Sequence, residues 1–483
     1  MPYATRRDWQ RFRVVVIAAG LAASILFVLA GVATRLQMYG DGSIFSYAVA
    51  AQDAWAFHWH NLSGRFFTYV YAYMVPEQIV ALTGSARAGI AVYGVLFFSA
   101  PLLGLLITAA ADRSRERIVF TYACASTVLL CPFVFGAPTE MWVAHAVFWP
   151  ALAVSLSAPA NVRGAIVVCL ALLALVFTHE GAIVLAASML VALLCRGWRH
   201  PVFVRACAAC ALAILVWAAV KLTIRPDDYI AAVLAAAAFR FIDLHNLAQP
   251  MVLTLCTALA GYSVVLLLLR AASIERAHVY SSLVCVAALA LFWARFDHWL
   301  LAEARYDLRT VLLIGIPVLG LVAALETMTA DDWQRSPLQS VGPWFLKARA
   351  LADPRALAGA FAFVLLMHAV ESGKFVSGWL DYKAAVRALA SGSVSNPELG
   401  SPLFVSSQHI GADLSRLAWN STTPFLSVLV APDFKPARLV VDPTAGYFWL
   451  SCKTAEQSEI ESRALPDEAR GLIRLHACLH RPN

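Results

Sequence analysis

The residue best suited to acid–base chemistry is Asp41, which follows the first long apolar segment of the chain. It lies in the sequence QMYGDGS at 37–43, where two glycines permit tight turns and close backbone approach. An ionisable group beside a bilayer needs water, a cation or a hydrogen-bonded pocket, so it indicates a functional site. The alternative is structural: Asp is a favoured N-cap, and Asp41 would then only cap a short helix over Gly42–Ala54.

Further candidates occur in short polar stretches between the other apolar segments. Carboxylates and histidines can transfer protons, and arginines can hold a phosphate group through paired hydrogen bonds. Arg305 and Arg309 are four residues apart and would share a helix face, which suits a phosphate clamp. The other candidates for substrate binding are Asp53, His58, Arg65, Glu140, His179 and Glu180.

Several of these candidates also have a structural explanation. His58 stands beside Trp59 and would suit a membrane interface without binding any ligand. Glu140 would cap the start of a helix, and His179-Glu180 would form a hydrogen bond across a hairpin. Two arginines at an interface would simply contact lipid headgroups. The types of these residues leave both explanations open.

Composition places the candidates in a membrane protein. Of the 483 residues 60% are hydrophobic and 14% are charged, against about 45–50% and about 25% in soluble domains. Apolar runs of about 20 residues alternate with short Arg-rich stretches, which is typical of a polytopic helical membrane protein. The net charge of +7 is spread over these stretches and does not indicate nucleic-acid binding. We therefore predict an all-α polytopic transmembrane bundle.

Positive loops determine the predicted orientation of about eleven spans. The predicted spans are 14–34, 88–110, 118–136, 142–159, 164–178, 181–195, 207–224, 251–269, 279–294, 310–326 and 356–371. Arg and Lys clusters mark the cytoplasmic side, so the N-terminus lies inside and the C-terminus outside. Phe66–Leu82 is then an interfacial or re-entrant helix on the outer side. Two short spans meet at His179-Glu180, with a single long helix as the alternative.

The tail differs in composition from the bundle. We predict a transmembrane domain over 1–371 and a small extracytoplasmic α/β domain over 372–483. The tail pattern predicts a helix at Gly378–Leu389 and strands at 403–406, 425–430, 438–441 and 447–451. On the outer side Cys452 and Cys478 would form a disulfide, with two unpaired thiols as the alternative.

The candidates fall in the outer loops of this topology, and the arrangement resembles the GT-C class of integral-membrane glycosyltransferases. Members of this class have an uncleaved first span, a long outer loop with juxtamembrane helices and a catalytic acid shortly after the first span. Asp41 occupies the place of that acid, and Phe66–Leu82 occupies that of a juxtamembrane helix. Many members carry paired acids here, whereas Asp41 is followed by Gly42, and the tail lacks a Trp-Trp-Asp type motif.

The resemblance implies inverting transfer of a sugar from a polyprenyl-phosphate donor to an extracytoplasmic glycan or lipid acceptor. Asp41 would be the base, and Arg305 or Arg309 would stabilise the departing phosphate. The chain has no Cys-x-x-Cys or Cys/His metal spacing, and we predict neither metal nor cofactor. The expected location is the inner (plasma) membrane with a periplasmic active face. A transporter or flippase, a polymerase or ligase for a lipid-linked saccharide, and a structural scaffold are the alternatives.

Overall fold

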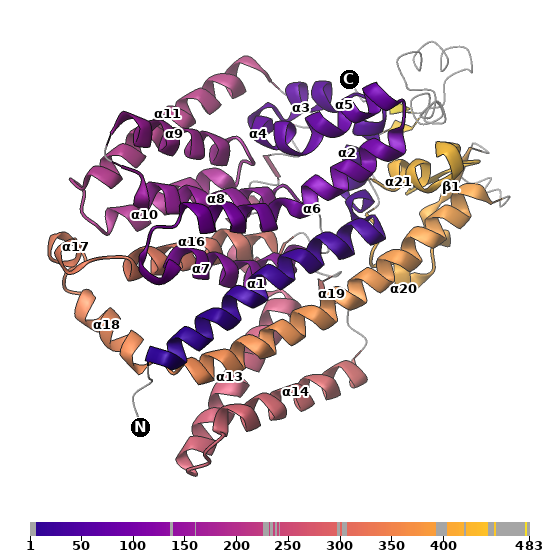
Figure 1. Cartoon of the computed structure of the whole chain (residues 1–483). Coiled ribbons are helices and arrows are strands. Elements are labelled where there is room, and N and C mark those ends of the chain that lie inside the picture. Colours follow the sequence, from indigo (N-terminus) through magenta and orange to yellow (C-terminus); the bar gives the residue numbers. More distant parts are fainter. Residues whose placement is uncertain are drawn as a thin grey trace.

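The computed structural model is mostly helical (Figure 1). It describes residues 6–135, 139–159, 161–225, 242–296, 307–392, 403–419 and 422–442, with short pieces at 231, 235–236, 239–240, 300–301, 449–450 and 479–480. Structural statements below concern these residues.

Among the described residues, eight helical segments are long and apolar enough to cross a membrane. They are α1 (Arg6–Thr34), α6 (Ala86–Ala111), Arg115–Val134 with α7 (Ile118–Leu130), α11 (Pro201–Thr223), α13 (Pro250–Ala271), α14 (Ala277–Arg295), α16 (Arg309–Glu326) and α19 (Pro354–Ser391). Shorter apolar helices are α8 (Met141–Ser157), α9 (Val162–Val176) and α10 (Ala182–Leu194). Each predicted span coincides with one of these segments, so the helical class is confirmed, while the number of spans stays a prediction.

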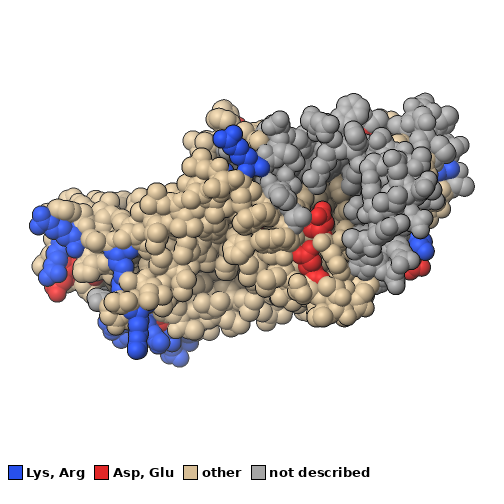
Figure 2. All heavy atoms as spheres, turned by 90° about the horizontal axis from the view of Figure 1, so that it is seen from above, with Lys and Arg blue, Asp and Glu red and all other residues tan. Residues whose placement is uncertain are grey.

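The outer surfaces of several helices suit a lipid environment. A helix satisfies its own backbone hydrogen bonds, which a bilayer requires. Leu215 of α11, Leu268 of α13 and Leu283 of α14 are exposed at 67%, 65% and 58%. Such large exposed apolar surfaces are rare on soluble monomers. On the face seen in Figure 2, Lys and Arg gather mainly at the left edge, and most of the remaining described surface is uncharged.

Ion pairs gather the Arg-rich loops at one end of the bundle. The pairs join Arg13 to Glu116, Arg355 to Asp8, and Arg270 to Asp353. These residues belong to loops and helix ends far apart in the sequence, yet all lie near the start of α1. The side of the membrane that this end faces stays a prediction from the positive-inside rule.

The chain turns back between α9 and α10. Near the start of α11, Arg205 donates a hydrogen bond to the Ala158 carbonyl just before α9 at 3.0 Å. Near the end of α11, Lys221 lies 3.3 Å from Glu180, just after α9. Helices α9 and α11 therefore run in the same direction, and α10 returns between them. The alternative of one long helix through His179-Glu180 is wrong.

The predicted interfacial segment is helical and lies over α6. It consists of α4 (Phe66–Thr68), a π-helical turn at Tyr69–Tyr73 and α5 (Met74–Thr83), after α2 (Asp41–Ala50) and α3 (Ala54–Asn61). The Tyr71 hydroxyl donates to the Leu96 carbonyl of α6 at 2.6 Å. Helices α2 to α5 cluster at the end of the bundle away from the N-terminus (Figure 1). A π-helical turn frequently marks a functional site.

The C-terminal part contains two small two-stranded sheets and short helices. Strand β1 (Phe404–Ser406) pairs in parallel with β2 (Leu439–Val441), and β3 (Trp449–Leu450) pairs antiparallel with β4 (Leu479–His480). Its short α-helices among the described residues are α20 (Ala412–Ser415) and α21 (Thr423–Val430), whereas α17 (Ala330–Arg335) and α18 (Gly342–Leu351) precede α19. Helix α19 continues without interruption through residue 371, so the change in composition there occurs inside one helix. Cys452 and Cys478 lie outside the described residues.

The predicted strand at 425–430 is wrong, because these residues belong to α21. The segment FLSVLV is apolar throughout, and a short apolar run does not distinguish a buried strand from a buried helix. Pro424 stands in the first turn, where its fixed φ favours a helix start. The predicted strands around β1, β2 and β3 are confirmed.

Candidate functional site at one end of the bundle

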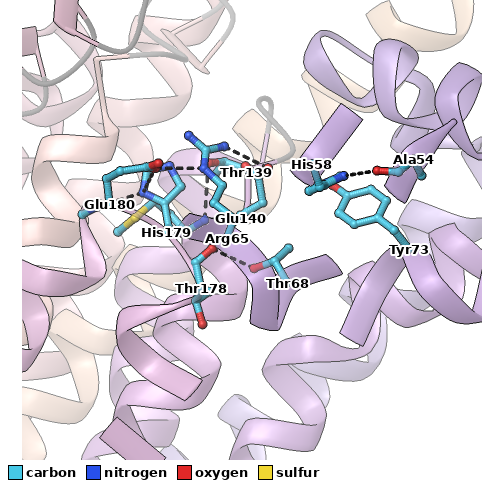
Figure 3. A network of polar contacts seen from close by, with 12 residues as sticks. Ala54, His58, Arg65, Thr68, Tyr73, Thr139, Glu140, Thr178, His179 and Glu180 are labelled. Atoms are coloured by element: carbon cyan, nitrogen blue, oxygen red, sulfur yellow. Dashed lines mark hydrogen bonds and ion pairs between the residues drawn. The ribbon is translucent and has the colours of Figure 1, made fainter. Parts of the chain in front are cut away.

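At the end opposite the Arg-rich loops, charged side chains from distant parts of the chain form one network. Figure 3 shows Arg65 between two carboxylates: its Nη1 donates to Glu140 Oε1 at 3.0 Å and its Nε donates to Glu180 Oε2 at 2.8 Å. Lys221 Nζ donates to Glu180 Oε1 at 3.3 Å. Two cations thus balance two carboxylates at a place where Arg65 and Glu140 are buried.

Backbone contacts hold Arg65 beside the break between α9 and α10. The Phe67 N–H donates to the Phe177 carbonyl at 3.0 Å, and the Thr68 hydroxyl donates to the Thr178 carbonyl at 2.8 Å. The last carbonyls of a helix lack partners within that helix, so donors from another segment can satisfy them. These two hydrogen bonds at the end of α9 therefore hold Arg65 close to Glu180.

Glu140 does not cap its helix. It stands immediately before α8, but its side chain makes no capping hydrogen bond and pairs with Arg65 instead. Burial raises the pKa of Glu140, but Arg65, His179 and Arg309 together with a backbone hydrogen bond outweigh burial, so the pKa of this carboxyl is lowered. The alternative that Glu140 is only a cap is wrong, and the carboxylate is held ionised.

Asp41 does not cap its helix either. It is the first residue of α2, Gly40 occupies the N-cap position, and no side-chain capping bond forms. Asp41 lies within electrostatic range of Arg309, Glu140 and Arg65. Burial raises the pKa of Asp41, Glu140 raises it further, and the arginines offset only part of this rise. The structure therefore places a carboxyl that holds its proton more tightly than usual beside two arginines.

The two glycines beside Asp41 are required by close contacts. Gly40 has φ of +57°, and a Cβ there would lie 2.6 Å from the Trp419 ring. A Cβ on Gly42 would overlap the Gln37 carbonyl oxygen. The C-terminal part holds this turn, because the Tyr39 hydroxyl donates to the Leu417 carbonyl at 2.8 Å. Residues far apart in the chain thus fix the position of Asp41.

Two histidines near the network are neutral. Burial lowers the pKa of His179 to about 3, and its Nδ1 accepts a hydrogen bond from the Gly181 N–H at 3.0 Å. Burial lowers the pKa of His58 to about 4, and its Nδ1 lies 2.8 Å from the Ala54 carbonyl (Figure 3). Among the described residues, His58 Nε2 has no hydrogen-bond partner although it is buried. His58 is therefore buried, and its role in binding a ligand stays a prediction.

Arg309 joins the network from α16, whose first residue it is. Its guanidinium is buried and lies within electrostatic range of Asp41, Glu140 and His179. A cation at a helix N-terminus opposes the helix dipole, so the nearby carboxylates must offset this cost. Arg305 lies outside the described residues, and the predicted clamp of Arg305 with Arg309 stays a prediction.

Asp53 is placed apart from the Arg65 pairs. It is exposed, and it acts electrostatically on Glu77, whose Oε1 accepts a hydrogen bond from the Ala54 N–H at 3.0 Å. Sequence reasoning gave Glu77 no role, and it missed Lys221. Lys221 could have been found, because it lies near the end of a predicted span. An ionisable residue inside an apolar segment indicates a buried partner.

We predict that acid destabilises the protein through Glu140 and Glu180. Burial raises the pKa of both carboxyls, but Arg65 together with His179 and other neighbouring groups outweighs burial and lowers each pKa below the ordinary value of 4.5. Their stabilising effect is therefore present above 4.5 and is lost as the pH falls through the folded-state values. As the pH falls from about 4.5 to about 2, the melting temperature of the wild type should therefore fall more steeply than that of Glu180→Gln.

The control for this prediction is Glu275→Gln, which removes an exposed carboxylate on another loop. It should retain the wild-type dependence on pH. Equal slopes for the wild type and Glu180→Gln would contradict the prediction.

No family model, curated protein or solved structure matches this chain. The fold and the site define a class, namely a mostly helical membrane protein with a buried charged network at one end.

Proposed function

We propose that the protein is an inverting membrane glycosyltransferase that moves a sugar from a polyprenyl-phosphate donor to an extracytoplasmic acceptor. The acceptor is a glycan or lipid in the assembly of envelope glycans or glycolipids. The observation that carries this proposal is the position of Asp41, a partly buried carboxyl with a raised pKa beside Arg309 and Arg65. A base and anion-binding groups are the two parts that this reaction needs.

The proposed reaction proceeds in one displacement. Asp41 accepts the proton of the acceptor hydroxyl, and the acceptor oxygen forms a bond with the anomeric carbon of the sugar. The bond between that carbon and the phosphate oxygen breaks, and both of its electrons leave with the polyprenyl phosphate. Arg309 stabilises the departing phosphate, and the configuration at the anomeric carbon inverts. The raised pKa of Asp41 makes its carboxylate a stronger base than an exposed aspartate.

Other side chains are assigned to substrate binding. Glu140, His179 and Glu180 stand around Arg65 and offer acceptors and donors for sugar hydroxyls. His58 Nε2, buried and unpartnered among the described residues, would hydrogen-bond a substrate hydroxyl or a water molecule.

A neighbouring cavity supports a lipid-linked donor. This cavity of about 610 Å³ lies next to the segment that carries Arg65. It is lined by apolar side chains, among them Phe66, Phe67, Val70, Leu173 and Phe177. A polyprenyl chain would lie in this cavity while its phosphate reaches the cations of the network.

The Arg-rich loops support the proposed sidedness. They gather at the opposite end of the bundle, and such loops mark the cytoplasmic side. The site would then open to the periplasm in the inner (plasma) membrane.

The test supplies labelled polyprenyl-phosphate sugars to the purified protein in liposomes that contain candidate acceptors. We expect a labelled product whose anomeric configuration is opposite to that of the donor. Heat-denatured protein is the control. Movement of the donor across the bilayer without a transferred sugar would contradict the proposal and favour a flippase.

A further inference from the structure

A second cavity, of about 570 Å³, lies where the end of α1 meets the start of α6, the far part of α19 and the C-terminal part. Its lining includes Met38, Ile90, Leu380, Leu429 and Phe434, which are apolar. It also includes Gln37, which precedes Asp41 by four residues. None of the acids assigned to the proposed reaction lines it.

Four cations line this cavity, and no carboxylate is found among the described residues of its lining. They are Arg35, Arg87, Lys383 and Arg387. The four come from the end of α1, the first turn of α6 and two successive turns of α19. Arg87 is paired with Asp433 at 2.6 Å, so one carboxylate approaches from outside the lining. The cavity keeps an excess of positive charge.

The fold holds these cations close together. Arg35 takes a left-handed conformation with φ of +57° directly after α1. Lys383 Nζ donates to the Thr34 carbonyl at 2.7 Å, which fixes α19 against the end of α1 and places Lys383 within electrostatic range of Arg35. Lys383 and Arg387 are four residues apart on α19, and like charges at this spacing repel each other. A bound anion would offset this repulsion.

Along α19, the distance from the start of the helix to this cavity is greater than the thickness of the hydrocarbon core of a bilayer. This helix has 38 residues, which span about 57 Å at about 1.5 Å per residue, whereas the hydrocarbon core is about 30 Å thick. The lining residues of α19 fall at 380–387, near its C-terminal end. This position corresponds to the headgroup layer or the solution beside it.

We propose that this cavity binds a phosphate group, in a mono- or diester, at a site distinct from the Asp41 network. Arginine guanidinium groups bind phosphate oxygens through paired hydrogen bonds, and a lysine adds a point charge. The apolar lining accommodates the rest of a lipid or glycan carrier. The phosphate comes from an anionic lipid headgroup or from solution, and these sources are distinguished by experiment. The proposal does not depend on the glycosyltransferase function.

The test uses the full-length protein in phosphatidylcholine nanodiscs. One arm adds increasing fractions of phosphatidylglycerol and counts bound lipids by native mass spectrometry. The other arm titrates inorganic pyrophosphate by calorimetry. We expect binding in at least one arm to weaken about tenfold or more in Arg35→Gln/Arg387→Gln, and to weaken with salt in the wild type. The arm that responds identifies the source.

The variant leaves the hydrogen bond from Lys383 to the Thr34 carbonyl intact, so it removes charge without removing this contact between α19 and the end of α1. The matched control is Arg11→Gln/Arg163→Gln, which removes two exposed charges elsewhere on the protein. The control should bind like the wild type. Equal binding by the cavity variant and the wild type in both arms would overturn the proposal. Equal weakening in both double variants would also overturn it, because net charge alone would then explain the effect.

Discussion

Asp41→Asn should lower the rate of sugar transfer by about 100- to 10,000-fold, the usual contribution of a general base. The amide has nearly the shape of the carboxylate but cannot accept the proton of the acceptor hydroxyl. Its position is determined by the turn at Gly40 and Gly42 rather than by any capping bond, so the substitution leaves the local fold intact.

The stability of this variant separates a catalytic role from a structural one. Burial raises the folded-state pKa of Asp41 above 3.8. Its stabilising contribution is therefore present below 3.8 and is lost as the pH rises through the raised value. At neutral pH the buried charge is a cost, which Asn removes. We expect Asp41→Asn to melt at the wild-type temperature or above it.

The matched control for this prediction is Asp381→Asn, which alters an exposed aspartate on α19. This control should transfer sugar at the wild-type rate. Transfer at the wild-type rate by a folded Asp41→Asn protein would contradict the assignment of the base. A large loss of thermal stability in that variant would instead show a structural role.

Arg65→Gln should destabilise the protein by about 3–5 kcal/mol, the usual cost of removing one partner of a buried ion pair. Arg65 contacts Glu140 and Glu180 through different nitrogens, and Glu140 is buried. Lys221 still compensates Glu180 in the variant, so most of the cost arises at Glu140. Arg65→Lys should recover little, because an ammonium group lacks the fixed geometry that joins two carboxylates.

Unfolding in denaturant measures this effect, and a double-mutant cycle assigns it. Glu140→Gln combined with Arg65→Gln should be less destabilised than the sum of the single variants, because the two residues interact. Arg163→Gln, an exposed arginine, should change stability by less than about 0.5 kcal/mol. A loss below about 1 kcal/mol in Arg65→Gln would show that the network is not a buried ion pair.

The local sequence was sufficient to predict the long helices, but it was insufficient to predict several short elements. Long apolar runs have one outcome in a bilayer, because only a helix satisfies the backbone there. The run at 425–430 was too short for this argument, and it forms α21 rather than a strand. Helix caps were equally ambiguous, since Asp41 and Glu140 stand at helix starts but neither helix start has a side-chain capping bond, and Glu140 pairs with Arg65 instead.

The sequence by itself determined that this chain forms apolar helices and that its acids and arginines fall in the loops between them. It also predicted that the Arg-rich loops lie at one end of the bundle and the candidate site residues at the other. The reason is that successive spanning helices run in opposite directions, so alternate loops share an end. Only the tertiary structure decided which charges meet. Arg65 is 75 residues from Glu140 and 115 from Glu180. These ion pairs form because α4, α8 and α9 pack against one another in space, and the spacing of residues along the chain does not predict them.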